Sequence, residues 1–309
     1  MRIKSPRSQS WLLTAVIALL CGSGIYTLVL NGATANDNIS YFVGAPDTTN
    51  DLTPWMHLQI GETVYPVAEH PKGMTGIGSV LVVPDPLGIQ GQVYKLSVTP
   101  AANFSAKSAK SDRVDLWNNN NTDYIGREGQ ETWEHVRLMF PHGNESYNPT
   151  SGDWNWLVEH HNDSNYKPFV NSGILTWEYP ELVWGVNTKA KLPDGTEVIK
   201  LFMRVWGGDD THPGKPTIIY QDSPLAFNHW YDMLTHVVWS HDGQKGQVEW
   251  WLDGKLLFSQ HTATLWQRPD GTIDHVNFEF TNYRLHSDMN STVYYSQVKL
   301  GPSRNSVLF

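Results

Sequence analysis

Residues 154–163 read WNWLVEHHND, and their alternation of apolar and polar side chains is typical of a β-strand. With a period of two, one face should pack in a core while the other carries reactive groups. The predicted core face consists of Trp154, Trp156, Val158 and His160. The predicted opposite face consists of Asn155, Leu157, Glu159 and His161. A carboxyl and an imidazole two residues apart on one face could share acid–base work, although a merely solvated outer face is the structural alternative.

The rest of the chain has the composition of an all-β protein. Its 309 residues include 25 Gly, 18 Pro and 14 Trp, which favours many short strands joined by turns. One large domain is expected, because sandwiches of this length often fold as a single unit. The most regular part predicts a hairpin of strands 234–240 and 247–252, followed by an Asp253-Gly254 turn. Further strands are predicted at 79–83, 93–98, 112–116, 131–141, 173–177, 182–186, 198–206, 217–220, 276–285 and 293–300.

The N-terminus has the pattern of an export signal. The first ten residues carry three positive charges and no negative charge, residues 11–30 are mostly apolar, and the A-x-A pattern follows at 33–35. We expect cleavage after Ala35 and a secreted or periplasmic protein, with an uncleaved single-pass anchor as the alternative. The only cysteine, Cys21, lies in this segment. The mature chain would therefore rely on its core instead of disulfides.

The charge balance of the chain argues against polyanionic partners. The formal net charge is −9, and losing the three basic residues of segment 1–35 would take it to −12. Such an acidic protein is a poor general binder of nucleic acid or of highly sulfated polyanions.

We expect a signal peptide at 1–35, an N-terminal strand with loops at 36–78, regular strands of the same domain at 79–301 and a tail at 302–309.

Residues 235–258 read THVVWSHDGQKGQVEWWLDGKLLF, a strand, a turn, a strand and a DGK signature. This segment resembles the polysaccharide lyases of the heparin lyase I-like and glucuronan or alginate lyase-like group. Three further segments support the resemblance over about 79–301: Arg113–Leu116 for the R-x-E-L motif, Glu128-Gly129 with Trp133 for E-G…W, and Val293–Gly301 for the closing strand. The resemblance implies an all-β, concanavalin A-like β-jelly-roll sandwich of two antiparallel sheets. It also implies a lyase that binds a polysaccharide. We expect a monomer, without nucleic acid and without stable membrane association after signal cleavage.

The functional motifs of that group match less completely. A Q-x-H strand and a K-x-x-x-Y strand line its cleft, and they correspond here to residues 159–161 and 279–283. His161 and Tyr283 are retained, whereas Glu159 replaces the amide and Glu279 replaces the lysine. Both replacements make the cleft more acidic, which argues against a strongly sulfated substrate such as heparin.

The resemblance assigns a role to each matched position. Elimination at a uronic acid removes the C5 proton, so charge that builds on the adjacent carboxylate must be neutralised. Arg113 is the candidate neutraliser, and Glu159 could donate to that carboxylate only if a raised pKa kept it protonated. His161 or Tyr283 would be the base and Tyr283 the acid, helped by a nearby cation such as Arg113 or Arg284. The remaining candidate substrate contacts are Arg204, Trp206, Glu279 and Arg284.

Several alternatives remain open. Packing or solvation would explain His161 and Tyr283 without function, and each of Trp177, Trp184 and Trp206 is either a sugar platform or core. A non-catalytic, laminin G-like carbohydrate-binding module would keep the fold and lose the chemistry. A glycoside hydrolase would need a carboxyl pair such as Glu159 with Glu279.

The lyase scheme requires no metal or cofactor. We do not expect zinc between His160 and His161, because adjacent strand residues point to opposite faces. A structural calcium ion is compatible with such jelly rolls, but no loop has a diagnostic spacing.

Overall fold

The computed structural model describes residues 57–60, 63–66, 78–99, 111–117, 125–150, 155–162, 180–209, 217–285 and 287–308. All of them fall within Asn38–Phe309, which forms one compact unit. The predicted signal segment 1–35, the predicted strand 173–177, and the residues Trp154, Asp163 and Trp177 lie outside the described residues. Within the described part of the chain, no helix has the length and apolarity needed to cross a membrane.

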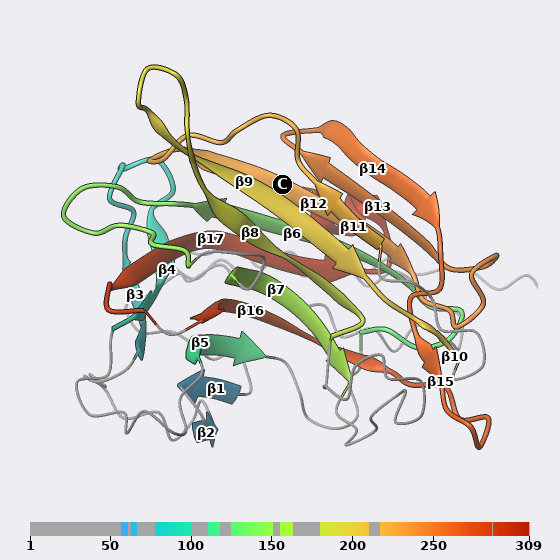
Figure 1. Cartoon of the computed structure of the whole chain (residues 1–309). Coiled ribbons are helices and arrows are strands. Elements are labelled where there is room, and N and C mark those ends of the chain that lie inside the picture. The colour runs from blue at the N-terminus through green and yellow to red at the C-terminus, as the bar shows by residue number, and fades with distance from the viewer. Residues whose placement is uncertain are drawn as a thin grey trace, which may run out of the picture. The chain divides into compact units, whose positions relative to one another are not determined.

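The described residues form two large antiparallel sheets and almost no helix, which confirms the predicted all-β fold (Figure 1). The eight-stranded sheet has the order β11 (Thr217–Tyr220), β9 (Glu197–Val205), β8 (Leu182–Lys191), β7 (Asn155–Asn162), β16 (Val276–Leu285), β5 (Ser111–Trp117), β1 (His57–Ile60) and β2 (Thr63–Pro66). The seven-stranded sheet has the order β14 (Lys255–His261), β13 (Gln247–Leu252), β12 (Trp230–Val238), β6 (Glu131–Met139), β17 (Ser291–Gly301), β4 (Gln92–Val98) and β3 (Gly78–Pro84). A small parallel pair joins β10 (Gly208–Asp209) to β15 (Trp266–Gln267), and the described helix is α1 (Arg304–Val307).

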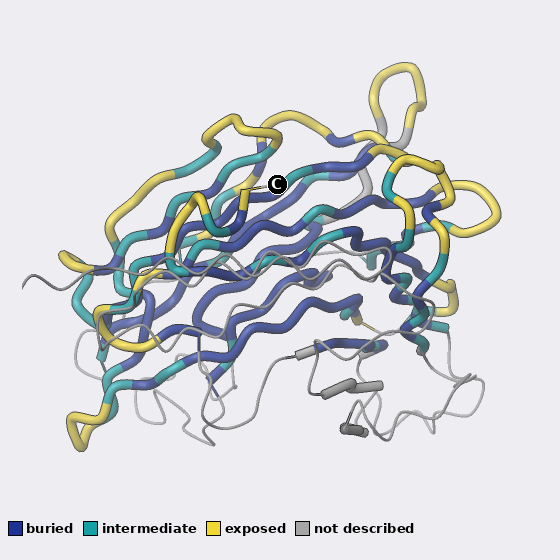
Figure 2. The backbone as a smooth tube through the Cα atoms, turned by 180° about the vertical axis from the view of Figure 1, so that it is seen from behind, coloured by how far each residue is buried: buried dark blue, intermediate teal, exposed yellow. Residues whose placement is uncertain are grey.

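The core lies between the two sheets, where inward side chains of both meet. From the eight-stranded sheet it includes Val114, Leu116, Val158, Trp184 and Phe280, and from the seven-stranded sheet Val136, Leu138, Trp250, Tyr295 and Val298. The strands are mostly buried and exposed residues gather in the turns (Figure 2). Trp184 therefore belongs to the core, with no exposed surface, and is not a sugar platform.

The predicted hairpin is confirmed by the pairing of β12 with β13. The following Asp253-Gly254 turn has φ angles of 49° and 77°, the left-handed conformation that a type I′ hairpin turn requires at both central positions. Strand β17, predicted as the closing strand, pairs with β6 on one side and β4 on the other. The tail forms α1, whose Val307 is buried and accepts a hydrogen bond at its backbone oxygen from His135 Nδ1 at 3.2 Å.

Strand β7 does not alternate regularly. Trp156 pairs with Gly185 and Val158 with Trp184, so β7 has one residue more than β8 at this point. Leu157 and Val158 both enter the core, while Trp156 packs on the outer face with Tyr283. The predicted faces of Trp156 and Leu157 were therefore wrong, because a bulge shifts the side-chain period by one residue. Beyond the bulge, the predicted faces of Val158, Glu159, His160 and His161 are confirmed by the core membership and the pairing with β16.

Two features support this bulge from within the sandwich. The hydroxyl of Tyr295, on β17, lies 2.7 Å from the carbonyl oxygen of Thr281 and 3.1 Å from that of Leu157. It thus supplies a donor to carbonyls at the irregular pairing, where ladder partners are missing. On the β8 side, a Cβ at Gly185 would lie 2.0 Å from the carbonyl oxygen of Asn155, so only glycine allows this close approach. Asn155 itself, predicted on the reactive face, is buried with its amide donating to Thr150 O and Val186 O.

Candidate active site

The outer face of the eight-stranded sheet collects most of the predicted catalytic residues. Strand β16 lies between β7 and β5, as Figure 1 shows. Glu279 is directly opposite Glu159 on β7, and Tyr283 is directly opposite Arg113 on β5. Directly opposite residues have Cβ atoms about 4.5 to 5.5 Å apart. His161 follows two residues after Glu159 on the same face.

Arg113 is the cation at the centre of this group. Its guanidinium is bonded to Asp115, donates from Nη2 to Glu279 Oε2 at 3.0 Å, and lies 4.5 Å from the centroid of the Tyr283 ring. Burial raises the pKa of Asp115 to about 7, although Arg113 opposes this shift. Burial also raises the pKa of Glu279, again against the attraction of Arg113. One guanidinium thus faces three carboxyls, more negative charge than it can balance.

Glu159 is the carboxyl that Arg113 does not bind directly. It has no exposed surface, and among the described residues neither of its carboxyl oxygens has a hydrogen-bond partner. Burial, together with the negative charge of Glu279, raises the pKa of Glu159 well above its usual value. This direction favours the protonated form of Glu159, the form in which its carboxyl could donate a hydrogen bond.

The ring of His161 is held in one tautomer. Its Nδ1 lies 2.8 Å from the carbonyl oxygen of Asn162, and a carbonyl oxygen can only accept. Nδ1 therefore carries the hydrogen in the neutral ring and Nε2 carries the lone pair. The adjacent His160 points the opposite way, into the core, where its Nε2 bonds to Glu134 of β6. The two histidines thus do not share a site, as the strand alternation predicted.

A further buried carboxyl, Glu181, supports the end of β7. Glu181 has no exposed surface and accepts hydrogen bonds from the Asn162 side chain at 2.7 Å and from its backbone N–H at 3.2 Å. Burial raises the pKa of Glu181 to about 8. The sequence analysis missed this residue because nothing near it in the chain resembles a motif.

The raised pKa of Glu181 predicts a pH-dependent stability. Between the ordinary pKa of 4.5 and about 8 the folded chain keeps this proton and the unfolded chain loses it. The free energy of unfolding should therefore fall by about 1.4 kcal/mol per pH unit in this range from this group alone. Glu181→Gln keeps an acceptor for Asn162 and removes this slope. We expect chemical denaturation to show that the free energy of unfolding of the variant rises relative to that of the wild type between pH 5 and pH 8. The same difference at both pH values would contradict this assignment.

Two predicted substrate contacts lie farther along the sheet. Arg204, on β9, is opposite Val183, which is itself opposite Glu159, so it shares their face two strands away. It is partly exposed and stays a candidate contact. Trp206 is 5% exposed and lies 6.3 Å, centroid to centroid, from Trp266, so little of its ring is open to a sugar.

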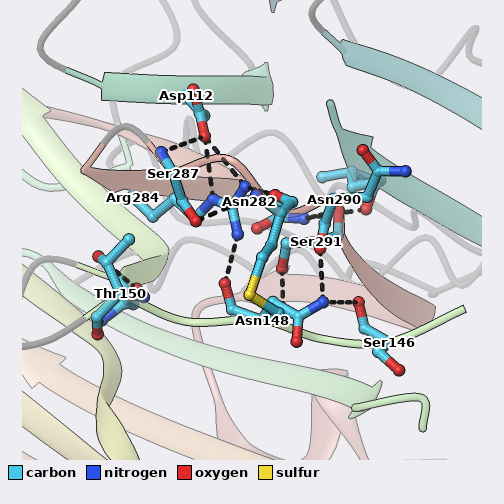
Figure 3. A network of polar contacts seen from close by, with 12 residues as sticks. Asp112, Ser146, Asn148, Thr150, Asn282, Arg284, Ser287, Asn290 and Ser291 are labelled. Carbon is cyan, nitrogen blue, oxygen red and sulfur yellow. Dashed lines mark hydrogen bonds and ion pairs between the residues drawn. The ribbon is translucent and has the colours of Figure 1, made fainter. Parts of the chain in front are cut away.

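Arg284 does not belong to this face. It is 1% exposed and its guanidinium is bonded to Asp112 at 3.0 and 3.1 Å and to the backbone oxygens of Asn148 and Met289 (Figure 3). Burial lowers its pKa in spite of Asp112. The sequence analysis placed it beside Tyr283 as a substrate contact, but the residue after an outward tyrosine on a strand faces inward.

Arg284 is therefore expected to affect stability rather than turnover. Arg284→Ala leaves the buried Asp112 carboxylate without its cationic partner, a change that typically costs about 3 to 5 kcal/mol. Chemical denaturation should report this loss, while activity per folded molecule stays within about twofold. Arg137→Ala is a matched control, because Arg137 makes only a half-exposed contact of 3.6 Å with Asp232. That exposed pair should contribute about 0 to 1 kcal/mol. A selective loss of activity in stable Arg284→Ala would restore the substrate-binding role.

Two polar residues join the site that sequence reasoning did not select. Asp115 shares the face of Arg113, two residues along β5, and its carboxyl also bonds the Thr281 hydroxyl. Asn277, on β16, is directly opposite His161. The same two-residue spacing that selected Glu159 and His161 could have found both. Among the described residues no group of three or more His, Cys, Asp or Glu side chains is arranged to hold a metal ion.

Comparisons with known proteins agree with this fold. The family model described as polysaccharide lyase matches residues 48–299. The endo-β-1,4-glucuronan lyase of the fungus Trichoderma reesei superposes with a TM-score of 0.57 at 14% identity, over 84% of this chain and 97% of that chain. An alginate lyase from Pseudomonas aeruginosa gives 0.48 at 9% identity, over 81% and 98% of the two chains.

A search among curated proteins gives no significant match. At this low identity, the likeness to the glucuronan lyase shows the fold alone. The family model, in contrast, spans most of the chain. The chain therefore belongs to the polysaccharide lyase family.

Proposed function

We propose that this polysaccharide lyase cleaves an unsulfated or weakly charged uronic-acid polysaccharide by β-elimination at the outer face of β5, β16 and β7. The observation that carries the proposal is Glu159, a buried carboxyl without a hydrogen-bond partner among the described residues. An unsatisfied buried polar group is costly, so it calls for a functional explanation. A neutral carboxylic acid can donate one hydrogen bond, as the amide at the matching position of the related lyases would.

The side chains divide the reaction between them. His161 Nε2, which holds the lone pair, takes the C5 proton of the uronate. Charge then builds on the uronate carboxylate, and the Glu159 O–H and the Arg113 guanidinium stabilise it. The C4–O bond breaks, its electrons remain on the leaving oxygen, and the hydroxyl of Tyr283 donates a proton to that oxygen. The product keeps a C4–C5 double bond conjugated with the carboxylate.

The charge of the site supports the substrate class. Three carboxyls surround Arg113, and the replacement of a motif lysine by Glu279 removes a cation that a sulfated chain would need. Sulfate groups would be repelled at this face, whereas a uronate carboxylate can still meet Arg113 and neutral Glu159. Glucuronan is the first substrate to test because the protein of known structure named above is a glucuronan lyase.

Export and the absence of a required cofactor are part of the same proposal. The N-terminal pattern supports cleavage after Ala35 and a secreted or periplasmic location. The groups assigned to proton transfer and charge stabilisation are all protein side chains, so the proposed mechanism requires no cofactor. N-terminal sequencing of the protein recovered outside the cytoplasm would test the cleavage site.

Ultraviolet absorbance of the unsaturated uronate tests the activity. The purified mature protein is incubated with glucuronan, alginate, hyaluronan and heparin, and absorbance is expected to rise with glucuronan or alginate and to stay flat with heparin. New reducing ends without absorbance would instead indicate hydrolysis by the Glu159 and Glu279 pair. Binding without absorbance or reducing ends would indicate a carbohydrate-binding module.

A further inference from the structure

Asn277, like Glu159, is a buried polar residue of the candidate active site that has an unsatisfied oxygen among the described residues. It is 5% exposed, and among the described residues its Oδ1 has no hydrogen-bond partner. The proposed mechanism gives this residue no task. A buried acceptor without a donor costs free energy in the unbound protein, so its retention indicates a donor supplied from outside.

The position of Asn277 defines what that donor can reach. Its neighbours Val276 and Phe278 are core residues, so Asn277 points to the outer face with Glu279. It is directly opposite His161 across the β7–β16 pair, which places the two Cβ atoms about 4.5 to 5.5 Å apart. A sugar unit whose C5 hydrogen meets His161 therefore brings its ring substituents beside the Asn277 amide.

We infer that Asn277 is a specificity-determining residue that accepts a hydrogen bond from a free hydroxyl of the sugar unit bound at His161. The inference rests on the proposed function and narrows its substrate class to uronans with unsubstituted hydroxyls at that unit. An ester or a sulfate on this oxygen removes the donor and adds bulk beside a buried amide. Sites built to bond a hydroxyl reject analogues that lack it more strongly than apolar pockets reject an added group.

A matched pair of substrates tests this specificity. Wild-type kcat/KM is measured on O-acetylated glucuronan and on the same polymer after saponification, with chain lengths matched. We expect the free-hydroxyl polymer to be favoured by about 10- to 100-fold. Asn277→Leu should lower kcat/KM on the free-hydroxyl polymer and bring the ratio close to one. Asn277→Asp, which retains an acceptor oxygen, should keep most of the discrimination.

The controls separate a specificity role from a structural one. Asn290→Leu, at an exposed position before β17, should leave the ratio unchanged. If Asn277→Leu does not fold, Asn277→Ala removes the same acceptor with a smaller side chain. An unchanged ratio in the folded variant, or no discrimination by the wild type, would overturn the inference while leaving the lyase activity in place. If the wild type forms no unsaturated product from any uronan of the panel, the proposed function fails and the inference fails with it.

Discussion

Replacement of His161 by alanine is expected to reduce kcat by about 10²- to 10⁴-fold, the usual contribution of a positioned general base. The reason is geometric, because the Nδ1 hydrogen bond to the Asn162 carbonyl leaves Nε2 as the only nitrogen of the neutral ring able to take a proton. Tyr283→Phe should cause a loss of similar size, since it removes the hydroxyl and keeps the ring beside Trp156. Both losses are measured as initial rates of ultraviolet absorbance.

Polysaccharide binding distinguishes lost chemistry from a lost fold. Both variants should bind the substrate within about fivefold of the wild type, because neither removes Arg113 or Glu159. His261→Ala, at an exposed histidine of β14 in the other sheet, is the matched control and should keep full activity. If His161→Ala remained active while Tyr283→Phe did not, Tyr283 would have to serve as both base and acid.

The activity losses caused by substitutions of Glu159 should rank differently from those at a catalytic carboxylate that must be ionised. Glu159→Gln retains a neutral donor of the same shape and should keep activity within about tenfold, whereas Glu159→Leu should lose about 10²- to 10³-fold, the usual cost of one missing donor to developing charge. The decisive measurement is kcat/KM for both variants on the substrate that the panel identifies. Equal inactivation of the two would mean that the ionised carboxylate is required, as a hydrolase nucleophile would require it.

The same residue predicts the alkaline limb of the pH profile. Only the protonated acid can donate, so wild-type activity should fall as the pH rises through the raised pKa of Glu159. Glutamine does not titrate, and Glu159→Gln should therefore remain active to higher pH than the wild type. The free energy of unfolding should also fall as the pH rises. A carboxyl whose pKa is raised in the folded state destabilises the fold increasingly above its ordinary pKa of 4.5. An identical alkaline limb in the two proteins would assign it to another group.

Much of the fold could be predicted from the sequence because its signals are local. The alternation in β16 and the Asp253-Gly254 turn each depend on a few neighbouring residues, and both appear in the structure. The bulge in β7 could not be predicted in this way, because it depends on partners far along the chain. Tyr295 supplies its donor and Gly185 its space, and neither lies near Leu157 in the sequence.

The site was predictable to the extent that its residues follow strand periodicity. Glu159, His161 and Tyr283 were identified from spacing and resemblance. The structure places all three on the outer face, with Tyr283 beside Arg113 and His161 opposite Asn277, six residues from Tyr283 along β16. Arg284 was misplaced because it was assigned to the site as the residue that follows Tyr283. On a strand, the residue after an outward tyrosine faces inward. Burial raises the pKa of Glu159, and burial is a property of the folded chain rather than of any short motif.

The extra residue at Leu157 also affects how this strand should be aligned with those of other family members. A relative without the bulge should show a one-residue gap there, yet carry the same outward residues on either side of it. An ungapped alignment would then match Trp156, which packs against Tyr283, with an inward residue of that relative. Substitutions at this position would be scored as changes of the core, although they alter the surface next to the proposed proton donor.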